Sequence, residues 1–387
     1  MTHETKNVPD LRFPEFKNEW ATTHLKDLGN FTSGGTPLKK KKAYWNGDIP
    51  WLTTGDINGK EIHKANNYIT QEGMENSSAK LINKEAILIA MYGQGKTRGM
   101  ASIINFEATT NQACAIFQTN NDIKFIHQLF RKDYYKLRSL SNDGSQKNLS
   151  LSLLKNYKIV VPEIEEQRKI GGFFNKLDQQ IELEEQKLEK LEEQKKGYMQ
   201  QIFSQKLRFK DENNNDYPEW KEQKLYEVVK YLSSKRSSNN YSENIMQGDY
   251  PVYDAIQEIS KDVNFDIKEP YISILKDGAG VGRLNLRPGK SSVIGTMGYL
   301  LPENIDINFL FYYLKTMNFN KFVIGSTIPH LYFKDYSKET IFVPKNEEEQ
   351  FKIGSFFIKL DKVIENKSDK IELLKERKKG FLQRMFV

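Results

Sequence analysis

The segment 91–100, MYGQGKTRGM, contains a Gly-Lys-Thr tripeptide at 95–97, which also closes the phosphate-binding loop of many nucleotide hydrolases. That loop requires a glycine five residues before the glycine of the tripeptide, and this chain has Ala90 there. No helix pattern follows the tripeptide either, although such a loop opens a helix. We therefore interpret the segment as the glycine-rich tip of a hairpin that presents Lys96 and Arg98.

Other residue types that support catalysis do not form a recognisable site. The chain has one cysteine, Cys114, inside a strand-like stretch, and this predicts a small buried residue rather than a nucleophile. A single cysteine excludes a disulfide framework and fits a reducing cytosol, so we expect a cytoplasmic protein. The histidines lack zinc-site spacing, and no Asn/Asp-Pro-Pro-Tyr/Phe string of an adenine methyltransferase occurs. The scattered histidines are His3, His24, His63, His127 and His330.

The bulk composition indicates a folded chain with an anionic partner. With 387 residues the chain is long enough for two or three domains, and aromatic residues make up 12% of it. The formal net charge is +7 and the isoelectric point is about 9.0, which favours nucleic acid among the possible partners. Neither a signal peptide nor an apolar run of membrane-spanning length is found, so we expect no contact with a membrane.

An internal repeat organises the chain. The stretch 167–203 returns at 350–386, 183 residues later and without a gap, and about half of the positions are identical. Each copy follows a strand that ends in Val-Pro, at Pro162 and at Pro344. Acidic residues lie in the first turn and lysines near the end, as the helix dipole favours. Each copy is therefore predicted to be one long helix.

Apolar residues recur at alternating intervals of four and three in both helices, which is the pattern of a coiled-coil seam. We predict that the two helices pair with each other, in antiparallel orientation because a two-fold relation between equivalent halves requires it. Polar residues such as Glu184 and Lys367 interrupt the seam and are expected to fix its register. Gly197 and Gly380 indicate either a close backbone approach or fraying. The seam residues are Ile170, Phe174, Leu177, Ile181, Leu188, Leu191, Tyr198 and Ile202, then Ile353, Phe357, Leu360, Ile364, Ile371, Leu374, Phe381 and Met385.

The repeat extends into the segments between the helices. LRFPEFKNEW at Leu11 is echoed by LRFKDENNNDYPEW at Leu207, and the strand and glycine turn around 86–99 are echoed around 271–284. The predicted domains are residues 1–160, an N-terminal domain with an arm; 161–205, a central helical spacer; 206–342, a second domain; and 343–387, a C-terminal helical spacer.

These features together resemble the specificity subunit of type I restriction-modification systems. The similarity rests on FTSGGTP at 31–37, YWNGDIPWLTTGDI at 44–57, the helix start P-x-x-x-E-Q-x-K-I-G at Pro162, and the tandem copy of the helix that follows Pro344. It covers nearly the whole chain. The second domain lacks the strings found at 31–37 and 44–57, as expected if the two domains bind different sequences.

The resemblance implies an α+β fold with two pseudo-symmetric, mixed α/β DNA target recognition domains, separated by two long helices that form an antiparallel coiled coil. It implies double-stranded DNA, two modification (methyltransferase) subunits and restriction (translocase and nuclease) subunits as partners. S-adenosylmethionine, ATP and Mg would then bind to those partners, and this chain would hold no cofactor, no metal and no catalytic residue.

Loop tips rich in Gly, Lys, Arg, Asn and Gln suit contacts with bases and phosphates. In the first domain we predict DNA contacts by Lys39, Lys40, Lys41, Lys42, Thr53, Thr54, Gly55, Asp56, Gly93, Gln94, Lys96, Thr97, Arg98, Asn111, Gln112, Ser145, Gln146, Lys147 and Asn148. In the second domain the candidates are Ser234, Lys235, Arg236, Lys276, Asp277, Gly278, Arg283, Thr327 and His330.

Two other functions remain open on the sequence alone. The chain would be a coiled-coil ATPase or scaffold if the loop at 91–100 bound nucleotide tightly. It would be a solitary DNA-binding regulator with a two-part target if no methyltransferase accompanied it.

Overall fold

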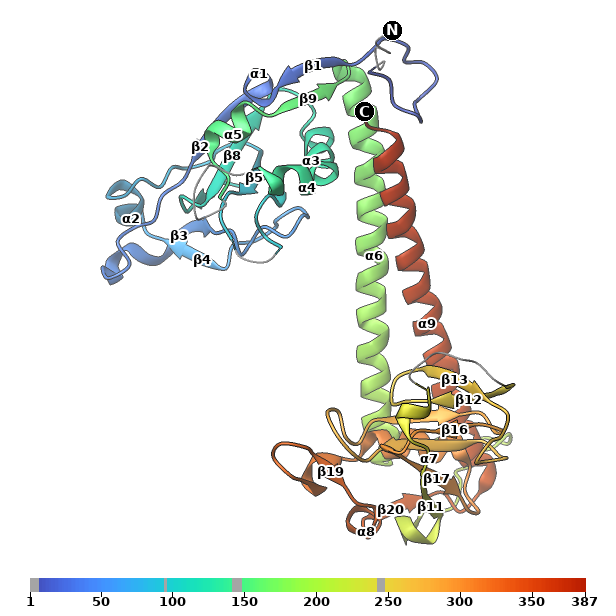
Figure 1. Ribbon diagram of the computed structural model, residues 1–387. Helices are drawn as coiled ribbons and strands as arrows, with labels where there is room; N and C mark the ends of the chain where they lie inside the picture. Colours follow the sequence, from blue (N-terminus) through green and yellow to red (C-terminus); the bar gives the residue numbers. More distant parts are fainter. Residues whose placement is uncertain (1–6, 94–95, 141–147, 242–247) are drawn as a thin grey trace. The chain divides into compact units, whose positions relative to one another are not determined.

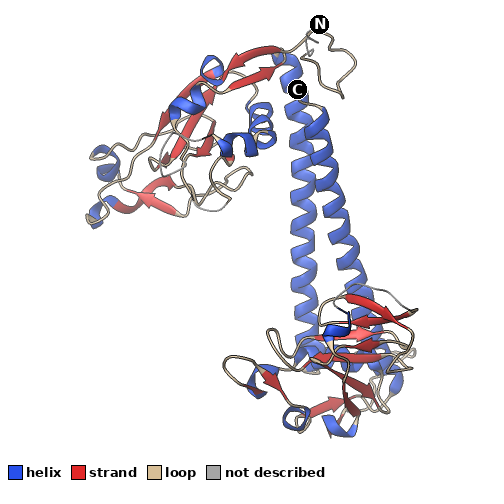
Figure 2. Cartoon of the chain, viewed as in Figure 1, coloured by secondary structure: helices blue, strands red, loops and turns tan. Residues whose placement is uncertain are grey.

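The structure, a computed structural model, describes residues 7–93, 96–140, 148–241 and 248–387 (Figure 1). The chain divides into two compact units, one of residues 1–185 with 370–387 and one of residues 186–369. In Figure 2 the strands lie in the α/β domain of each unit, outside the two long helices. No helix in the described part of the chain is long and apolar enough to cross a membrane.

The first domain is built on a four-stranded antiparallel sheet in the order β2-β8-β5-β6. Its middle strand β5, sequence AILIA, is buried at every position, as a strand covered on both faces requires. A second sheet has the order β4-β3-β7, and β1 pairs with β9. The strands are β1 (Ala21–His24), β2 (Gly29–Ser33), β3 (Trp45–Leu52), β4 (Asn67–Ile69), β5 (Ala86–Ala90), β6 (Ala101–Ile104), β7 (Thr109–Thr110), β8 (Cys114–Thr119) and β9 (Lys158–Val161).

Short helices cover this sheet. The Asp122 carboxylate accepts a hydrogen bond from the Phe125 backbone N–H at 2.7 Å and so caps α3, whose apolar face enters the core. The helices of the domain are α1 (Leu25–Leu28), the 3-10 turn η1 (Lys42–Tyr44), α2 (Gln71–Glu75), α3 (Ile123–Lys132), α4 (Tyr134–Ser139) and α5 (Leu151–Lys155).

The second domain repeats this topology, which confirms the predicted duplication. Its four-stranded sheet has the order β11-β17-β14-β15, its three-stranded sheet has the order β13-β12-β16, and β10 pairs with β20. The strands are β10 (Lys221–Lys224), β11 (Val229–Ser233), β12 (Tyr250–Tyr253), β13 (Glu258–Asp262), β14 (Tyr271–Leu275), β15 (Leu284–Arg287), β16 (Ser292–Val293), β17 (Met297–Pro302), β18 (Val323–Ile324), β19 (His330–Leu331) and β20 (Thr340–Val343). The helices are η2 (Leu225–Glu227), η3 (Ser238–Tyr241), α7 (Ile307–Thr316), η4 (Phe319–Phe322) and α8 (Phe333–Tyr336).

The two long helices are α6 (Ile164–Phe203) and α9 (Glu347–Arg384). In the first unit Asp178 pairs with Lys378, and Glu184 lies 3.2 Å from Lys370. In the second unit Lys195 pairs with Asp361. In both units a later position in α6 meets an earlier position in α9, since Tyr198, after Lys195, contacts Phe356, before Asp361, so the predicted antiparallel pairing is confirmed (Figure 1).

The predicted seam residues line this contact to different degrees. Tyr198 is the most open of them, at 38% exposed. The buried members are Ile170, Phe174, Ile181, Ile202, Ile353, Phe357, Ile371, Leu374 and Met385, and the half-buried ones are Leu177, Leu188, Leu191, Leu360, Ile364 and Phe381. Two polar residues of the seam are also buried: Glu184 is 6% exposed and Lys378 is 4% exposed. Each has an oppositely charged partner, which buried charges require.

Glycines at the start of the two long helices allow each domain to dock. A Cβ on Gly171 would lie 2.1 Å from the Asp122 carboxylate, and one on Gly354 would lie 2.8 Å from the Asp306 carboxylate. Gly197 and Gly380 differ, because no described atom lies within 4 Å of a Cβ built on either. Of the two alternatives given for those residues, the close backbone approach is therefore wrong.

The Glu-Gln pair of the helix-start motif completes the docking. Gln167 donates to the Pro162 carbonyl at 2.9 Å and accepts from the Asp122 backbone N–H, and Gln350 repeats both contacts with Pro344 and Asp306. Glu166 accepts a two-pronged bond from Arg12, and Glu349 accepts one from Arg208. The motif therefore holds a domain and its preceding arm onto the first turn of a long helix.

Candidate nucleic-acid interface

One edge of the first domain gathers most of the predicted contact segments. β2 and β5 end there and β8 and β6 begin there, because Ser33 is opposite Ala115 and Ala90 is opposite Cys114. Backbone hydrogen bonds then link the turns beyond the strands, from Asn111 to Leu52, from Met91 to Ala113 and from Leu149 to Met91. The segments at 53–56 and 111–112, together with residues 93, 96–98 and 148, therefore come together at a single edge.

The loop with the Gly-Lys-Thr tripeptide joins β5 to β6 and opens no helix, so the hairpin interpretation is confirmed. Gly93 has φ 147°, a value that side-chain-bearing residues rarely adopt. Lys96 is exposed, whereas Arg98 donates to the Arg138 carbonyl at 3.0 Å. Lys96 is thus available to a ligand, and Arg98 helps to hold the loop on α4. Gln94 and residue 95 lie outside the described residues, as do Ser145, Gln146 and Lys147.

The turn at 53–56 is stabilised by hydrogen bonds to the carboxylate of Asp56, its last residue. Asp56 accepts from the Thr53 backbone N–H at 2.8 Å and from its hydroxyl at 2.9 Å, and Asn66 donates to the other carboxylate oxygen. Gly55 is exposed and Thr54 is half-buried. The Asp56 carboxylate is therefore engaged within the turn, and the backbone around Gly55 is the more accessible part.

Two further groups of predicted residues flank this edge. Gln112 is exposed and accepts a hydrogen bond from Thr36 at 2.6 Å, while the neighbouring Asn111 is half-buried. The four lysines 39–42 lie before β3 and are all exposed, although Lys41 pairs with Glu72 at 2.8 Å. Lys39, Lys40 and Lys42 are therefore better placed than Lys41 to bind an anionic ligand.

The second domain gathers its predicted segments at the equivalent sheet edge. Ser234 donates its backbone N–H to Met297, and Lys276 donates its own to Thr296 at 2.9 Å. The turn after β14 also joins the loop before β19, because Gly278 donates to the Pro329 carbonyl at 2.9 Å. The segments at 234–236, 276–283 and 327–330 are thus brought together, although they are far apart in the sequence.

Several side chains of this edge that were predicted to contact DNA have partners inside the domain. The Ser234 hydroxyl is buried and donates to the Val293 carbonyl. The Arg236 guanidinium pairs with Asp262 at 2.5 Å and with Asp266 at 2.8 Å. Their direct contact with DNA stays a prediction, and these partners favour a structural role.

Asp277 is similarly engaged, since it lies 2.5 Å from Lys276 Nζ and 2.7 Å from His330 Nδ1. Lys235, Arg283 and Thr327 are exposed, and Gly278 is half-buried with φ 95°. These side chains and the Gly278 backbone are accessible at the edge.

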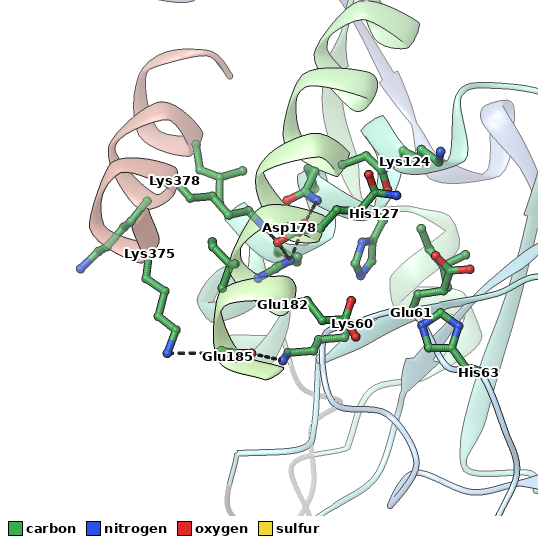
Figure 3. A pocket seen from close by; sticks show the side chains of 18 residues that line it. Lys60, Glu61, His63, Lys124, His127, Asp178, Glu182, Glu185, Lys375 and Lys378 are labelled. Atoms are coloured by element: carbon green, nitrogen blue, oxygen red, sulfur yellow. Dashed lines mark hydrogen bonds and ion pairs between the residues drawn. The ribbon is translucent and has the colours of Figure 1, made fainter. Parts of the chain in front are cut away.

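A cavity of about 350 Å³ in the first unit lies between α3, α6, α9 and the segment at 60–63 (Figure 3). On its wall Asp178 accepts hydrogen bonds from Lys378, Gln128 and Arg131. Burial raises the pKa of Asp178, but Arg131 and Lys378 outweigh it and hold the pKa below its ordinary value. Burial lowers the pKa of Lys378 to about 8. This network was not predictable from the sequence, because its members come from three separate elements.

His127 lies on the same wall and is fully enclosed. Its Nε2 is 3.0 Å from the Ala101 carbonyl, so this nitrogen carries the hydrogen and donates it. Burial lowers the pKa of the ring to about 4, which leaves it neutral near pH 7. In the second unit Asp361 is the repeat counterpart of Asp178, and there the Tyr312 hydroxyl donates to it at 2.6 Å. The charges of the cavity therefore tie the first domain to both helices.

The structure agrees with the interpretation of Cys114 as a buried residue of a strand. Its burial raises the pKa of the thiol to about 12, so the reactive thiolate does not form near neutral pH. Among the described residues, no three or more His, Cys, Asp and Glu side chains are grouped so that they could hold a metal ion.

Fold and surface together define a duplicated scaffold, in which two equivalent domains present different loops while the same helix-start contacts anchor both. A family model described as "Type I restriction modification DNA specificity domain" matches residues 17–193 and 217–376. The chain belongs to this family, and it is the specificity subunit of a type I restriction-modification system.

Individual relatives are similar over different lengths. The MjaIX specificity subunit of Methanocaldococcus jannaschii is 24% identical over 95% of this chain and 92% of its own length. The EcoR124I/EcoR124II specificity subunit of Escherichia coli is 33% identical over 43% of each chain. The solved S subunit from M. genitalium has a TM-score of 0.69, covers 98% of this chain and 99% of its own, and is 18% identical, which shows a shared fold.

Proposed function

We propose that each α/β domain binds one half of a split DNA target and that α6 and α9 set the distance between the halves. The observation that carries this proposal is a contrast: the contacts that hold each domain on its helix are the same in both halves, but the loops at the two sheet edges are not. Gly171 and Gly354, with the Glu-Gln pair before each, keep the same contacts, whereas the loops at the two sheet edges differ in sequence and length. Conserved anchors with different edges suit a protein that reads two different sequences.

The charge of the edges supports DNA as the ligand. Exposed lysines at 39, 40 and 42 and at position 96 suit phosphates, which position a protein on the duplex without reading its sequence. Arg283 and Gln112 are exposed and carry the planar donor groups that pair with guanine and adenine edges. The two edges thus offer both kinds of contact.

The remaining parts of the proposal follow from the family. Two modification subunits would dock on the long helices, and restriction subunits would complete the complex. S-adenosylmethionine, ATP and Mg would bind to those subunits, so this cytoplasmic chain would recognise DNA without catalysing a reaction itself.

Genome-wide mapping of N6-methyladenine tests the proposal. Cells that express the chain with its modification subunits should methylate adenines in one split motif, and deletion of the chain alone should abolish that methylation. A continuous motif would contradict recognition by two domains. DNA binding without any change in methylation would instead indicate a solitary regulator.

A further inference from the structure

The end of β18 and the loop between β18 and β19 carry exposed apolar side chains on the predicted DNA-binding edge of the second domain. Ile328 is 58% exposed and Ile324 is 52% exposed, and the residues between them are exposed as well. The large apolar side chain of Ile328 gains nothing from the fold of its own domain, and its place on the predicted DNA-binding edge makes it a candidate for a ligand contact. The neighbouring Thr327 and His330 were predicted from the sequence to contact DNA, whereas Ile328 was not.

This loop is braced rather than loose. The Pro329 carbonyl accepts from Gly278 at 2.9 Å, and the Leu331 backbone N–H donates to Lys276 at 2.8 Å. Gly325 has φ 88°, and a Cβ built there would lie 2.4 Å from the Ile328 carbonyl. Only glycine therefore allows this tight turn, and the turn fixes the position of Ile328.

The surroundings of Ile328 suit a duplex. His330 sits at the base of the loop between Asp277 and the ring of Tyr332, which lies 6.2 Å away and nearly parallel. Lys334 lies 5.4 Å from the same Tyr332 ring, and Arg283 is exposed on the adjoining turn. An apolar tip on an edge that also carries the exposed cations Arg283 and Lys334 fits a ligand that offers phosphates beside an apolar group.

The chemistry of Ile narrows what it can recognise. Its side chain has no donor or acceptor, so it cannot read the hydrogen-bonding groups of a base edge. In the major groove the apolar group of a base edge is the 5-methyl of thymine. Insertion between base pairs is the other apolar contact, but it costs a few kcal/mol of unstacking, whereas a methyl contact leaves the duplex intact.

We propose that Ile328 contacts the methyl group of a thymine in the half-site bound by the second domain, and so helps to specify a T·A pair there. This inference rests on the proposed function and adds a residue and a base to it. It also predicts that the second half-site contains at least one thymine on either strand.

The test uses the full chain with its modification subunits and the split target found by methylation mapping. Each thymine of the second half-site is replaced in turn by deoxyuridine, which removes only the methyl group. For the unsubstituted chain, one replacement should weaken binding about fourfold, the value expected when one methyl contact is lost. Ile328→Ala should bind the thymine-containing target about fourfold more weakly and should no longer respond to that deoxyuridine.

Tyr226→Ala is the control, because Tyr226 is 53% exposed on η2, at the end of β11 opposite to Ser234 and the predicted edge. It should bind like the unsubstituted chain and keep the full deoxyuridine effect. The inference is overturned if no deoxyuridine position matters, if Ile328→Ala retains the effect, or if the half-site holds no thymine. A rise in 2-aminopurine fluorescence that depends on Ile328, without a deoxyuridine effect, would show base-step insertion instead. If the unsubstituted chain does not prefer the split target over a scrambled one, the proposed function itself fails.

Discussion

At the scale of single residues, the exposed charges at the sheet edges are what a DNA ligand would meet first. Lys96 combines exposure with a place on the turn between β5 and β6, and its backbone carbonyl accepts from the Tyr134 hydroxyl at 2.5 Å. The ammonium group therefore projects from a supported loop.

Lys96→Ala should weaken DNA binding without affecting the fold, because the side chain is exposed. Loss of one phosphate contact should reduce the slope of log K against log salt by about 1. Filter binding or fluorescence anisotropy at several salt concentrations measures this slope. Lys26→Ala, on α1 at the opposite end of β2, is the control and should keep the original slope. Equal slopes for both variants would remove Lys96 from the interface.

His127 makes a prediction about pH. The folded chain keeps this ring neutral down to about pH 4, whereas an unfolded chain protonates histidine near pH 6.5. Below pH 6.5 the unfolded state thus binds more protons, and stability falls as the pH drops towards 4, by about 3 kcal/mol in total.

The comparison with His127→Gln isolates this contribution, because the glutamine amide can still donate to the Ala101 carbonyl. Between pH 6.5 and 4.5, the free energy of unfolding of the original chain should decrease more steeply than that of the variant. Parallel curves from chemical denaturation would show that His127 is not the group responsible.

The sequence does not predict which side chains are occupied by partners within the fold. The type and loop position of Arg236 suited a base contact, but Asp262 and Asp266, about thirty residues away, occupy its guanidinium. No local pattern announces such pairs, because they depend on which loops the sheet brings together. Ile328 was missed for the complementary reason, since exposure of an apolar residue is visible only in three dimensions.

At the scale of elements, the glycines of α6 and α9 serve different purposes. Gly171 and Gly354 lie against the capped starts of α3 and α7, and Gly197 and Gly380 face open space. Substitution by alanine should therefore have opposite effects on stability at the two kinds of position.

Gly171→Ala and Gly354→Ala should each lower the free energy of unfolding by about 2 kcal/mol or more, because the methyl group displaces the capping carboxylate. Gly197→Ala and Gly380→Ala should each raise it by up to about 1 kcal/mol, the helix-propensity gain of alanine. Thermal and chemical denaturation of the four variants measures the difference. Destabilisation by all four would contradict the distinction between docking and open glycines.

The long helices and their pairing were predictable, because a repeat of apolar residues over many turns is a strong local signal. The orientation followed from the duplication, and the ion pairs of Asp178 with Lys378 and of Lys195 with Asp361 agree with it. The function of the Glu-Gln motif was not predictable, because its partners Arg12 and Arg208 lie more than a hundred residues away along the chain.

At the scale of the whole molecule, α6 and α9 are the elements that both units share, since each helix begins in one unit and ends in the other. In the proposed function, the length of α6 and α9 sets the gap between the two half-sites. One heptad adds about 10 Å to a helix, and duplex DNA rises about 3.4 Å per base pair.

The most direct test inserts one heptad after Leu188 in α6 and a matched heptad after Ile371 in α9, which preserves the seam in both helices. Methylation mapping then reads both half-sites and their gap. The account predicts unchanged half-sites with a gap longer by about three base pairs. An unchanged gap in a chain that still methylates DNA would contradict it.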